Sequence, residues 1–472
     1  MIHEVRQLVW GPWLLAAFLA AGIIFTMRLR FFQILHLRRW LRETAGRLMG
    51  NGSPGERSGR GGNRAGQGEG EGGGDGSQFL SVCTALAATV GTGNIVGVAT
   101  AITSGGAGAL FWMWVSAFLG MATAYGETYL GVKFSGAGAR GRMLSGPMAY
   151  MERGLKKPWM AAVYSLCCVL SSLGMGSMVQ ANSIAESVGY VFSVDRRLAG
   201  MALAAAVMAV TAGGARRIVS MAGRLVPISA GLYMSACLVI IFSCLGQVPA
   251  VLGRVFEGAF GIRAAAGGAA GYGISRAIQY GLSRGVFSNE AGLGSLALLN
   301  GASEAGGEGA PERQGMWAMF EVFFDTILSC TLTALVILCT AEKFGALPEL
   351  LDGGALTAHC FSVYFGMWGE RLVAVSMVLF AFSTIIAWFY LGLKSLDYLT
   401  GSRAAVYVYA FLYLHAVAFG CFFSLKPVWE LSDILNGLMA VPNLAAVLLL
   451  RKMVCLPGSG AETRKAGQAR GK

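Results

Sequence analysis

An apolar segment that would otherwise form a membrane-spanning helix is interrupted near its middle by a polar, glycine-rich run. The segment Thr89–Ile102 reads TVGTGNIVGVATAI, with glycine at positions 91, 93 and 97. Glycine lowers helix propensity, so a stretch of Gly-Thr-Gly-Asn favours unwinding at this point. Unwound backbone at membrane depth is tolerated only where it is buried in protein, lines a cavity or contacts an ion. The segment therefore predicts a binding site within a membrane protein.

A second interruption, SNEAGLGS at Ser288–Ser295, lies in the other half of the chain. Two glycine-interrupted apolar segments in corresponding positions of two halves indicate the substrate site of a secondary transporter. Composition agrees, because 55% of the 472 residues are hydrophobic, 13% are charged and the mean hydropathy is +0.58. These values exclude an ordinary soluble domain and predict an all-α polytopic membrane protein.

Apolar runs of about 20 residues, the length that spans a bilayer, predict about eleven transmembrane helices. They fall near residues 8–27, 78–103, 107–134, 158–192, 198–213, 222–246, 270–300, 313–342, 370–398, 404–424 and 433–452. Ten spans follow the first one, and they divide into two groups of five. The interrupted segment 78–103 opens the first group, and the interrupted segment 270–300 opens the second. Because five is odd, the second group enters the membrane from the opposite side. The pattern predicts an N-terminal helix followed by two inverted five-helix repeats with discontinuous first helices.

The chain divides into six parts on this interpretation. They are an N-terminal helix with a basic flank (1–45), a Gly-rich disordered cytoplasmic loop (46–76), the first repeat (77–246), an extracellular connection (247–269), the second repeat (270–452) and a basic cytoplasmic tail (453–472). Lys and Arg concentrate in the loops that alternation places with the 46–76 loop and the tail. The positive-inside rule then predicts an outside N-terminus and a cytoplasmic C-terminus in the plasma membrane. The net charge of +12 reflects these loops, so no nucleic-acid partner is expected.

Polar residues inside the apolar spans are the candidate ligands. In the first interruption, Thr92, Gly93 and Asn94 offer freed carbonyls to a cation and freed N–H groups to a substrate carboxylate. Close helix packing would explain the glycines but not the asparagine and threonine together. Gln180 and Asn182, in a long apolar span, suit a zwitterionic ligand, and an interhelical hydrogen bond is the alternative.

Charged residues of the second half are costly in an apolar region and point to a cavity or to partners. Arg284 and Glu290 flank the second interruption, and a structural pair between them is one interpretation. Asp325, in FFDTILSC, is either a group on a cation path or one half of a buried pair. A structural role is favoured for Glu127, in AYGETYL.

Adjacent hydroxyls at Ser383 and Thr384 lie in the run FAFSTIIAWFY. Hydroxyl and carbonyl oxygens are the ligands that hard cations prefer, so a sodium site is plausible here. Trp388 lies one helical turn after Thr384 on the same face and is a candidate wall for a small substrate pocket.

These segments resemble the alanine/glycine:cation symporter family of prokaryotic sodium–amino acid symporters. The resemblance rests on long stretches in the family's order, which cover nearly everything after residue 78: 84–127, 146–155, 180–187, 283–295, 323–338, 380–392 and 438–450. It implies a leucine-transporter-like core of two inverted five-helix repeats with an extra N-terminal helix.

The resemblance also implies roles for individual residues. Substrate would bind at Thr92, Gly93, Asn94, Gln180, Thr384 and Trp388, and sodium would bind at Thr89, Gly93, Ser383 and Thr384. The family commonly has a Gly-Gly-Pro where this chain has Ser145-Gly146-Pro147, and Ala-Pro where Leu296-Ala297 follow the second interruption. These departures leave the expected pocket intact.

The expected function is sodium-coupled import of a small neutral amino acid, alanine or glycine, by alternating access. Sodium is the co-transported ion, no organic cofactor is expected, and the oligomeric state stays open. The alternatives are proton coupling through Asp325, Glu127 or Glu290, and a membrane amino acid sensor that has lost transport. An enzyme is not expected, because no nucleophile–base pair or metal constellation is present.

Overall fold

The computed structural model describes residues 2–48, 75–138, 141–261, 268–301, 309–345, 351–423 and 425–457, and these are almost entirely helical. The expected 46–76 loop and 453–472 tail fall largely outside these ranges. The only strands in the described ranges, β1 (Gly136–Ala137) and β2 (Met143–Leu144), pair antiparallel as a short hairpin.

The N-terminal part and the first half contain the following helices: α1 (Ile2–Val9), α2 (Pro12–Arg28), α3 (Phe32–Leu35), α4 (Leu37–Glu43), α5 (Ala45–Leu48), α6 (Asp75–Thr89), α7 (Val96–Gly105), α8 (Ala109–Lys133), α9 (Gly146–Ala149), α10 (Pro158–Ser171), α11 (Gln180–Phe192), α12 (Arg196–Thr211) and α13 (Gly214–Ser243). A 3-10 turn, Thr92–Asn94, lies between α6 and α7. A π-helical stretch, Tyr150–Gly154, follows α9, and another, Ser172–Val179, joins α10 to α11.

The connection and the second half contain α14 (Val248–Phe260), α15 (Gly268–Asn289), α16 (Ser295–Gly301), α17 (Ala310–Val322), α18 (Thr331–Phe344), α19 (Gly353–Phe365), α20 (Met367–Leu399), α21 (Arg403–Gly420) and α22 (Leu425–Leu450). A third π-helical stretch, Phe323–Cys330, joins α17 to α18. The expected connection 247–269 is therefore built largely of a helix, α14.

Eight helices of the described residues are long and apolar enough to cross a bilayer, and a ninth is added if α6 and α7 count as one bent span. Two of the eleven expected spans are not among them. Helix α12 has only 16 residues, and the 270–300 segment is divided between α15 and α16. Eleven spans and the repeat symmetry stay predictions.

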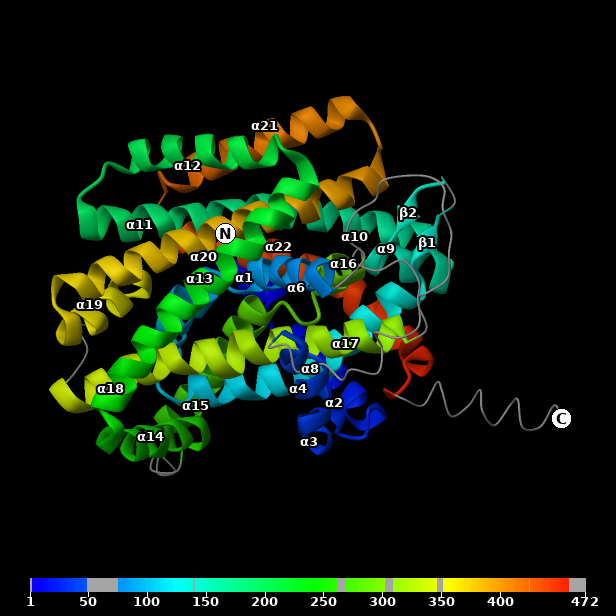
Figure 1. Ribbon diagram of the computed structural model, residues 1–472. Coiled ribbons are helices and arrows are strands. Elements are labelled where there is room, and N and C mark those ends of the chain that lie inside the picture. Colours follow the sequence, from blue (N-terminus) through cyan, green and yellow to red (C-terminus); the bar gives the residue numbers. More distant parts are fainter. Residues whose placement is uncertain are drawn as a thin grey trace.

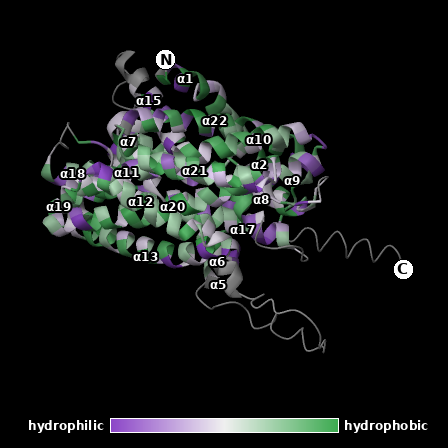
Figure 2. Ribbon diagram, turned by 90° about the horizontal axis from the view of Figure 1, so that it is seen from above, coloured by the Kyte–Doolittle hydropathy of each residue, from purple (hydrophilic) through white to green (hydrophobic). Residues whose placement is uncertain are grey.

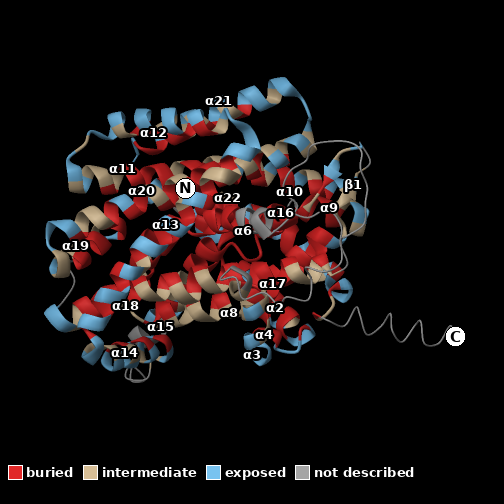
Figure 3. Cartoon of the chain, viewed as in Figure 1, coloured by how far each residue is buried: buried red, intermediate tan, exposed pale blue. Residues whose placement is uncertain are grey.

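The core lies where the interrupted helices meet the long helices of the second half. Figure 1 shows α6, α20 and α22 running through the middle of the bundle, with α12 and α21 along one outer edge. Figure 3 shows the same centre buried and the outer helices exposed. Figure 2 shows that hydrophobic residues predominate along the helices. Large apolar side chains such as Tyr407 and Phe411 of α21 are exposed at 76% and 60%, which suits a lipid-facing surface.

Candidate functional site

The first interruption is a true break in the helix. Helix α6 ends at Thr89, α7 begins at Val96, and the two are bent by 53°. The Asn94 side chain closes the break, because its Oδ1 accepts a hydrogen bond from the Gly91 N–H at 3.0 Å. Thr92, Gly93 and Asn94 are completely or almost completely buried. The break is therefore enclosed by protein, as backbone unwound at membrane depth must be.

The second interruption is held in a left-handed conformation. Helix α15 ends at Asn289, and Glu290, Gly292 and Gly294 have φ values of 56°, 91° and 81°. Glycine adopts such angles without cost, whereas a residue with a side chain pays about 1–2 kcal/mol. The Asn289 Oδ1 accepts from the Ala291 N–H at 3.1 Å, which stabilises the turn.

The two breaks touch each other. A Cβ atom added to Gly93 would lie 3.1 Å from the Ser288 Cα, so any other residue would push the two backbones slightly apart. Asp325, in the π-helical stretch Phe323–Cys330, binds both breaks: its carboxylate accepts from Asn94 Nδ2 at 2.7 Å and from Ser288 Oγ at 2.7 Å. Thr326 Oγ1 also donates to it at 2.8 Å. The Asp325 carboxylate is thus hydrogen-bonded by three donors in the described part of the chain.

Four of the expected ligands gather around Gly91. The Thr92 N–H donates to Gln180 Oε1 at 3.2 Å, and a Cβ at Gly91 would lie 2.6 Å from Thr384 Oγ1. Gly93 follows on the same turn. Asn94 belongs to the break, but its side chain amide is directed to Asp325 and Gly91.

One expected sodium ligand, Thr384 of α20, forms a hydrogen bond with the last turn of α6. Thr384 Oγ1 lies 2.8 Å from the Ala87 carbonyl oxygen, in the last turn of α6. The hydroxyl of Thr89 is directed to the Leu86 carbonyl of its own helix at 3.3 Å, and that of Ser383 to the Phe380 carbonyl at 2.8 Å. Carbonyl and hydroxyl oxygens at a helix C-terminus fit a monovalent hard cation.

Trp388 is completely buried next to this group. Its indole Nε1 donates to Glu290 Oε1 at 2.9 Å, and its Cβ would lie 2.4 Å from a Cβ added to Gly176. The second break and the π-helical stretch Ser172–Val179 therefore both contact the Trp388 side chain.

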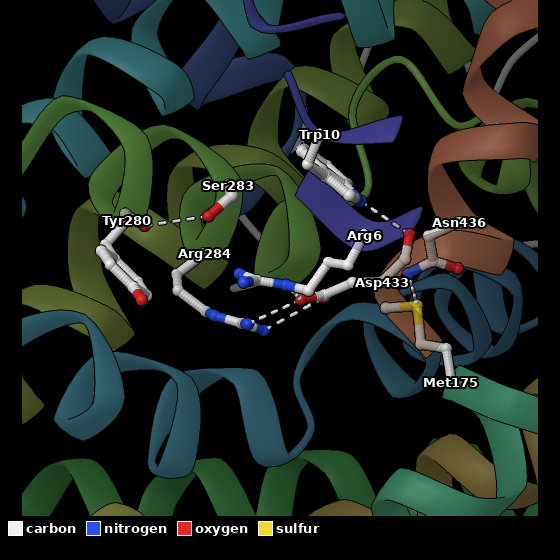
Figure 4. A network of polar contacts seen from close by, with 8 residues as sticks. All are labelled: Arg6, Trp10, Met175, Tyr280, Ser283, Arg284, Asp433 and Asn436. Carbon is white, nitrogen blue, oxygen red and sulfur yellow. Dashed lines mark hydrogen bonds and ion pairs between the residues drawn. The ribbon is translucent and has the colours of Figure 1, made fainter. Parts of the chain in front are cut away.

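Arg284 and Glu290 do not pair, so that interpretation is wrong. Figure 4 shows the Arg284 guanidinium directed at Asp433 of α22, with Nη2 2.8 Å from Oδ2. Arg6 of α1 binds the same carboxylate through Nε at 2.8 Å, and the Trp10 Nε1 donates to the Asp433 carbonyl at 2.6 Å. Sequence reasoning missed Arg6 and Asp433, although single charges in apolar spans were the available signal.

Asn182 forms interhelical hydrogen bonds, which was the alternative to ligand binding. Its Nδ2 donates to the carbonyl oxygens of Gly420 at 2.8 Å and Phe423 at 2.7 Å, at the end of α21. Glu127 likewise accepts from Asn443 Nδ2 at 2.5 Å, and the same amide donates to the Gly292 carbonyl at 2.9 Å. These two side chains hold helices and the second break in place.

Comparison with known proteins identifies the family. The family model described as "Sodium:alanine symporter family" matches residues 1–457. The chain belongs to the sodium:alanine symporter family. Membership confirms the resemblance noted from the sequence. The protein is therefore a multi-pass membrane transport protein. Its family implies sodium co-transport and a small amino acid substrate.

Relatives within the sodium:alanine symporter family match nearly the whole chain. "Sodium/alanine symporter AgcS" of Methanococcus maripaludis is 38% identical over 96% of this chain and 95% of its own length. An "Uncharacterized transporter" of Haemophilus influenzae is 39% identical over 96% and 94%. "Probable sodium/glutamine symporter GlnT" of Bacillus subtilis is 35% identical over 96% and 88%.

A solved structure shares the fold. The manganese transporter of Eremococcus coleocola, crystallised as its mutant H236A, has a TM-score of 0.51 and 14% identity, and the match covers 81% of this chain and 79% of that one. At this identity the likeness concerns the fold of a transporter alone.

Proposed function

We propose that this protein is a sodium-coupled symporter that imports alanine, glycine or a similarly small neutral amino acid by alternating access. The observation that carries the proposal is the cluster around Gly91, where a broken helix meets Gln180 and Thr384. Free N–H groups at a helix start attract a carboxylate, and free carbonyls at a helix end attract a cation. One break therefore suits both a sodium ion and an amino acid.

The substrate ligands proposed are Thr92, Gly93, Asn94, Gln180, Thr384 and Trp388, and the sodium ligands are Thr89, Gly93, Ser383 and Thr384. Support differs among them. The Thr384 hydroxyl contacts the last turn of α6 as well as the Phe380 carbonyl of its own helix, whereas the hydroxyls of Thr89 and Ser383 bond only within their own helices. Sodium binding would need these two hydroxyls to turn, or would use backbone carbonyls at the same positions.

The architecture proposed is an N-terminal helix and two inverted five-helix repeats, 77–246 and 270–452, with the N-terminus outside and the C-terminus in the cytoplasm. Contact between the two breaks supports it, because inverted repeats place their first helices at the centre. The sites of both repeats then meet at Gly93 and Ser288.

Proton coupling is the second candidate, and buried carboxylates favour it. Asp325, Glu127 and Glu290 are wholly buried and are held by hydrogen-bond donors. A buried carboxylate that carries no neighbouring cation is costly unless it takes up a proton or an ion.

The deciding experiment is uptake of radiolabelled alanine and glycine into proteoliposomes under separately imposed sodium and pH gradients. We expect uptake driven by the sodium gradient. Thr384→Val keeps the shape and removes the hydroxyl, so it should raise the sodium concentration for half-maximal uptake about tenfold, which corresponds to about 1.4 kcal/mol. Thr384→Ser retains the oxygen and is the matched control. Uptake driven by the pH gradient alone, or an unchanged sodium requirement in Thr384→Val, would overturn the assignment.

A further inference from the structure

The second break and the proposed substrate pocket are joined by one side chain contact. Glu290, inside the break, accepts the indole N–H of Trp388 at 2.9 Å through Oε1. Its other oxygen accepts from Ser295 Oγ at 2.5 Å, at the start of α16. All three side chains are completely buried. The carboxylate therefore fixes the indole from one side and is itself fixed by the helix that follows the break.

The base of the Trp388 side chain packs against backbone. A Cβ at Gly176 would lie 2.4 Å from the Cβ and 2.7 Å from the Cγ of Trp388, a distance that real side chains do not adopt. Gly176 belongs to the π-helical stretch Ser172–Val179, and such stretches widen a helix locally and often mark functional sites. Trp388 is thus held between a glycine notch and a carboxylate.

This arrangement places the indole at one end of the proposed pocket. On α20, Trp388 follows Thr384 by four residues, and on the neighbouring helix Gly176 precedes Gln180 by four. Thr384 and Gln180 both face Gly91, so the Trp388–Gly176 contact lies one turn away, about 6 Å along the helix axis. A substrate bound at the break would direct its side chain either towards this wall or away from it.

Glu290 adopts an energetically unfavourable backbone conformation, which indicates that other contacts hold it in this position. Its φ of 56° is left-handed, which is unfavourable for a residue with a side chain, and its carboxylate is buried. Strained conformations persist where the surroundings over-determine them and cluster at ligand sites. A glycine would remove the backbone strain at this position but would also remove the acceptor of the indole N–H.

We propose that Glu290 is a positioning residue that sets substrate size: it clamps Trp388 as the wall that excludes amino acids larger than alanine. The inference rests on the proposed function, because the wall matters only if the Gly91 region holds the amino acid. It adds that the limit on side chain size is imposed from the second break. Loss of the clamp frees the indole to change its orientation and enlarges the pocket.

The test measures inhibition of sodium-driven alanine uptake by glycine, alanine, valine and leucine in proteoliposomes. Trp388→Phe removes the indole N–H, and Glu290→Ala removes its acceptor. Each substitution should raise the affinity for leucine relative to alanine about tenfold. This is the lower end of the discrimination that one methylene group produces in a hydrophobic pocket. The double variant should change the ratio no further than the larger single effect, because both remove one contact.

Two variants serve as controls. Glu290→Gln retains an acceptor oxygen and should keep the selectivity of the unaltered protein. Trp114→Phe removes a comparable indole hydrogen bond, to Thr331 Oγ1 at 2.8 Å, on α8 and should leave the ratio unchanged.

The proposal is overturned if Trp388→Phe leaves the ratio of leucine affinity to alanine affinity unchanged. This test remains available even if Glu290→Ala does not fold. It is also overturned if the variants weaken all four amino acids equally. Absence of sodium-driven alanine uptake by the unaltered protein is a separate result, because it refutes the proposed function itself.

Discussion

Replacement of Asp433 by asparagine should destabilise the protein far more than loss of an exposed ion pair. The Asp433 carboxylate contacts Arg6 and Arg284 at 2.8 Å each, and these three side chains are exposed by only 4%, 8% and 4%. Asp433→Asn leaves two guanidinium groups buried without their counter-ion. Removing one partner of a buried ion pair costs about 3–5 kcal/mol. From the entropy of unfolding per residue, this predicts a fall of roughly 3–5 °C in the unfolding temperature.

The matched control is the exposed pair between Arg254 and Glu342, whose atoms lie 2.7 Å apart and whose side chains are 58% and 22% exposed. Such pairs contribute about 0–1 kcal/mol, so Glu342→Gln should lower the unfolding temperature by about 1 °C or less. Both variants are compared with the unaltered protein by thermal unfolding in the same detergent. Equal shifts for Asp433→Asn and Glu342→Gln would refute the argument, because they would mean that water reaches the cluster in the membrane protein.

Further variants test the first break and the segment between α5 and α6. Gly93→Leu should abolish sodium-dependent alanine binding in calorimetry, because even a Cβ at this position would lie 3.1 Å from the Ser288 Cα. Gly97→Ala is the control: its Cβ would meet only Trp429, at 3.9 Å, and should change alanine binding little. Sodium-dependent binding that survives Gly93→Leu would place the site elsewhere. Deletion of residues 52–75, all but the last of which lie outside the described residues, should leave alanine uptake intact at matched expression. Loss of uptake would show that this segment takes part in gating or docking.

Local chemistry made both breaks predictable from the sequence. Helix α6 ends at Thr89, where the glycine run begins, and α15 ends at Asn289, where the second run begins. Helix propensity depends on a few neighbouring residues, so glycines inside an apolar segment reveal the break without knowledge of the fold. The meeting of Gln180 and Thr384 at the first break came from the family resemblance and not from local pattern.

Partners far apart in sequence could not be predicted. Arg284 was expected near Glu290, six residues away, but pairs with Asp433, which is 149 residues away. Nothing in the local sequence distinguishes these two outcomes, because Glu290 and Asp433 are both carboxylates in apolar segments. Gly176 is similar: it is one of many glycines, and its function as a notch for Trp388 exists only in the packed structure.

The geometry suggests why the two breaks differ in composition. The first is held by the Asn94 side chain and contacts the second through Gly93, so it can change shape by rotating glycine backbone. The second is held by a strained Glu290 that reaches Trp388 and by Asn443, which reaches Glu127. Because Asp325 bonds to both breaks, a shift at one alters the contacts of the other. If sodium binds at the first break as proposed, a small rearrangement there would be transmitted through Asp325 to the second break and to Trp388, which is the coupling that the proposed symport requires.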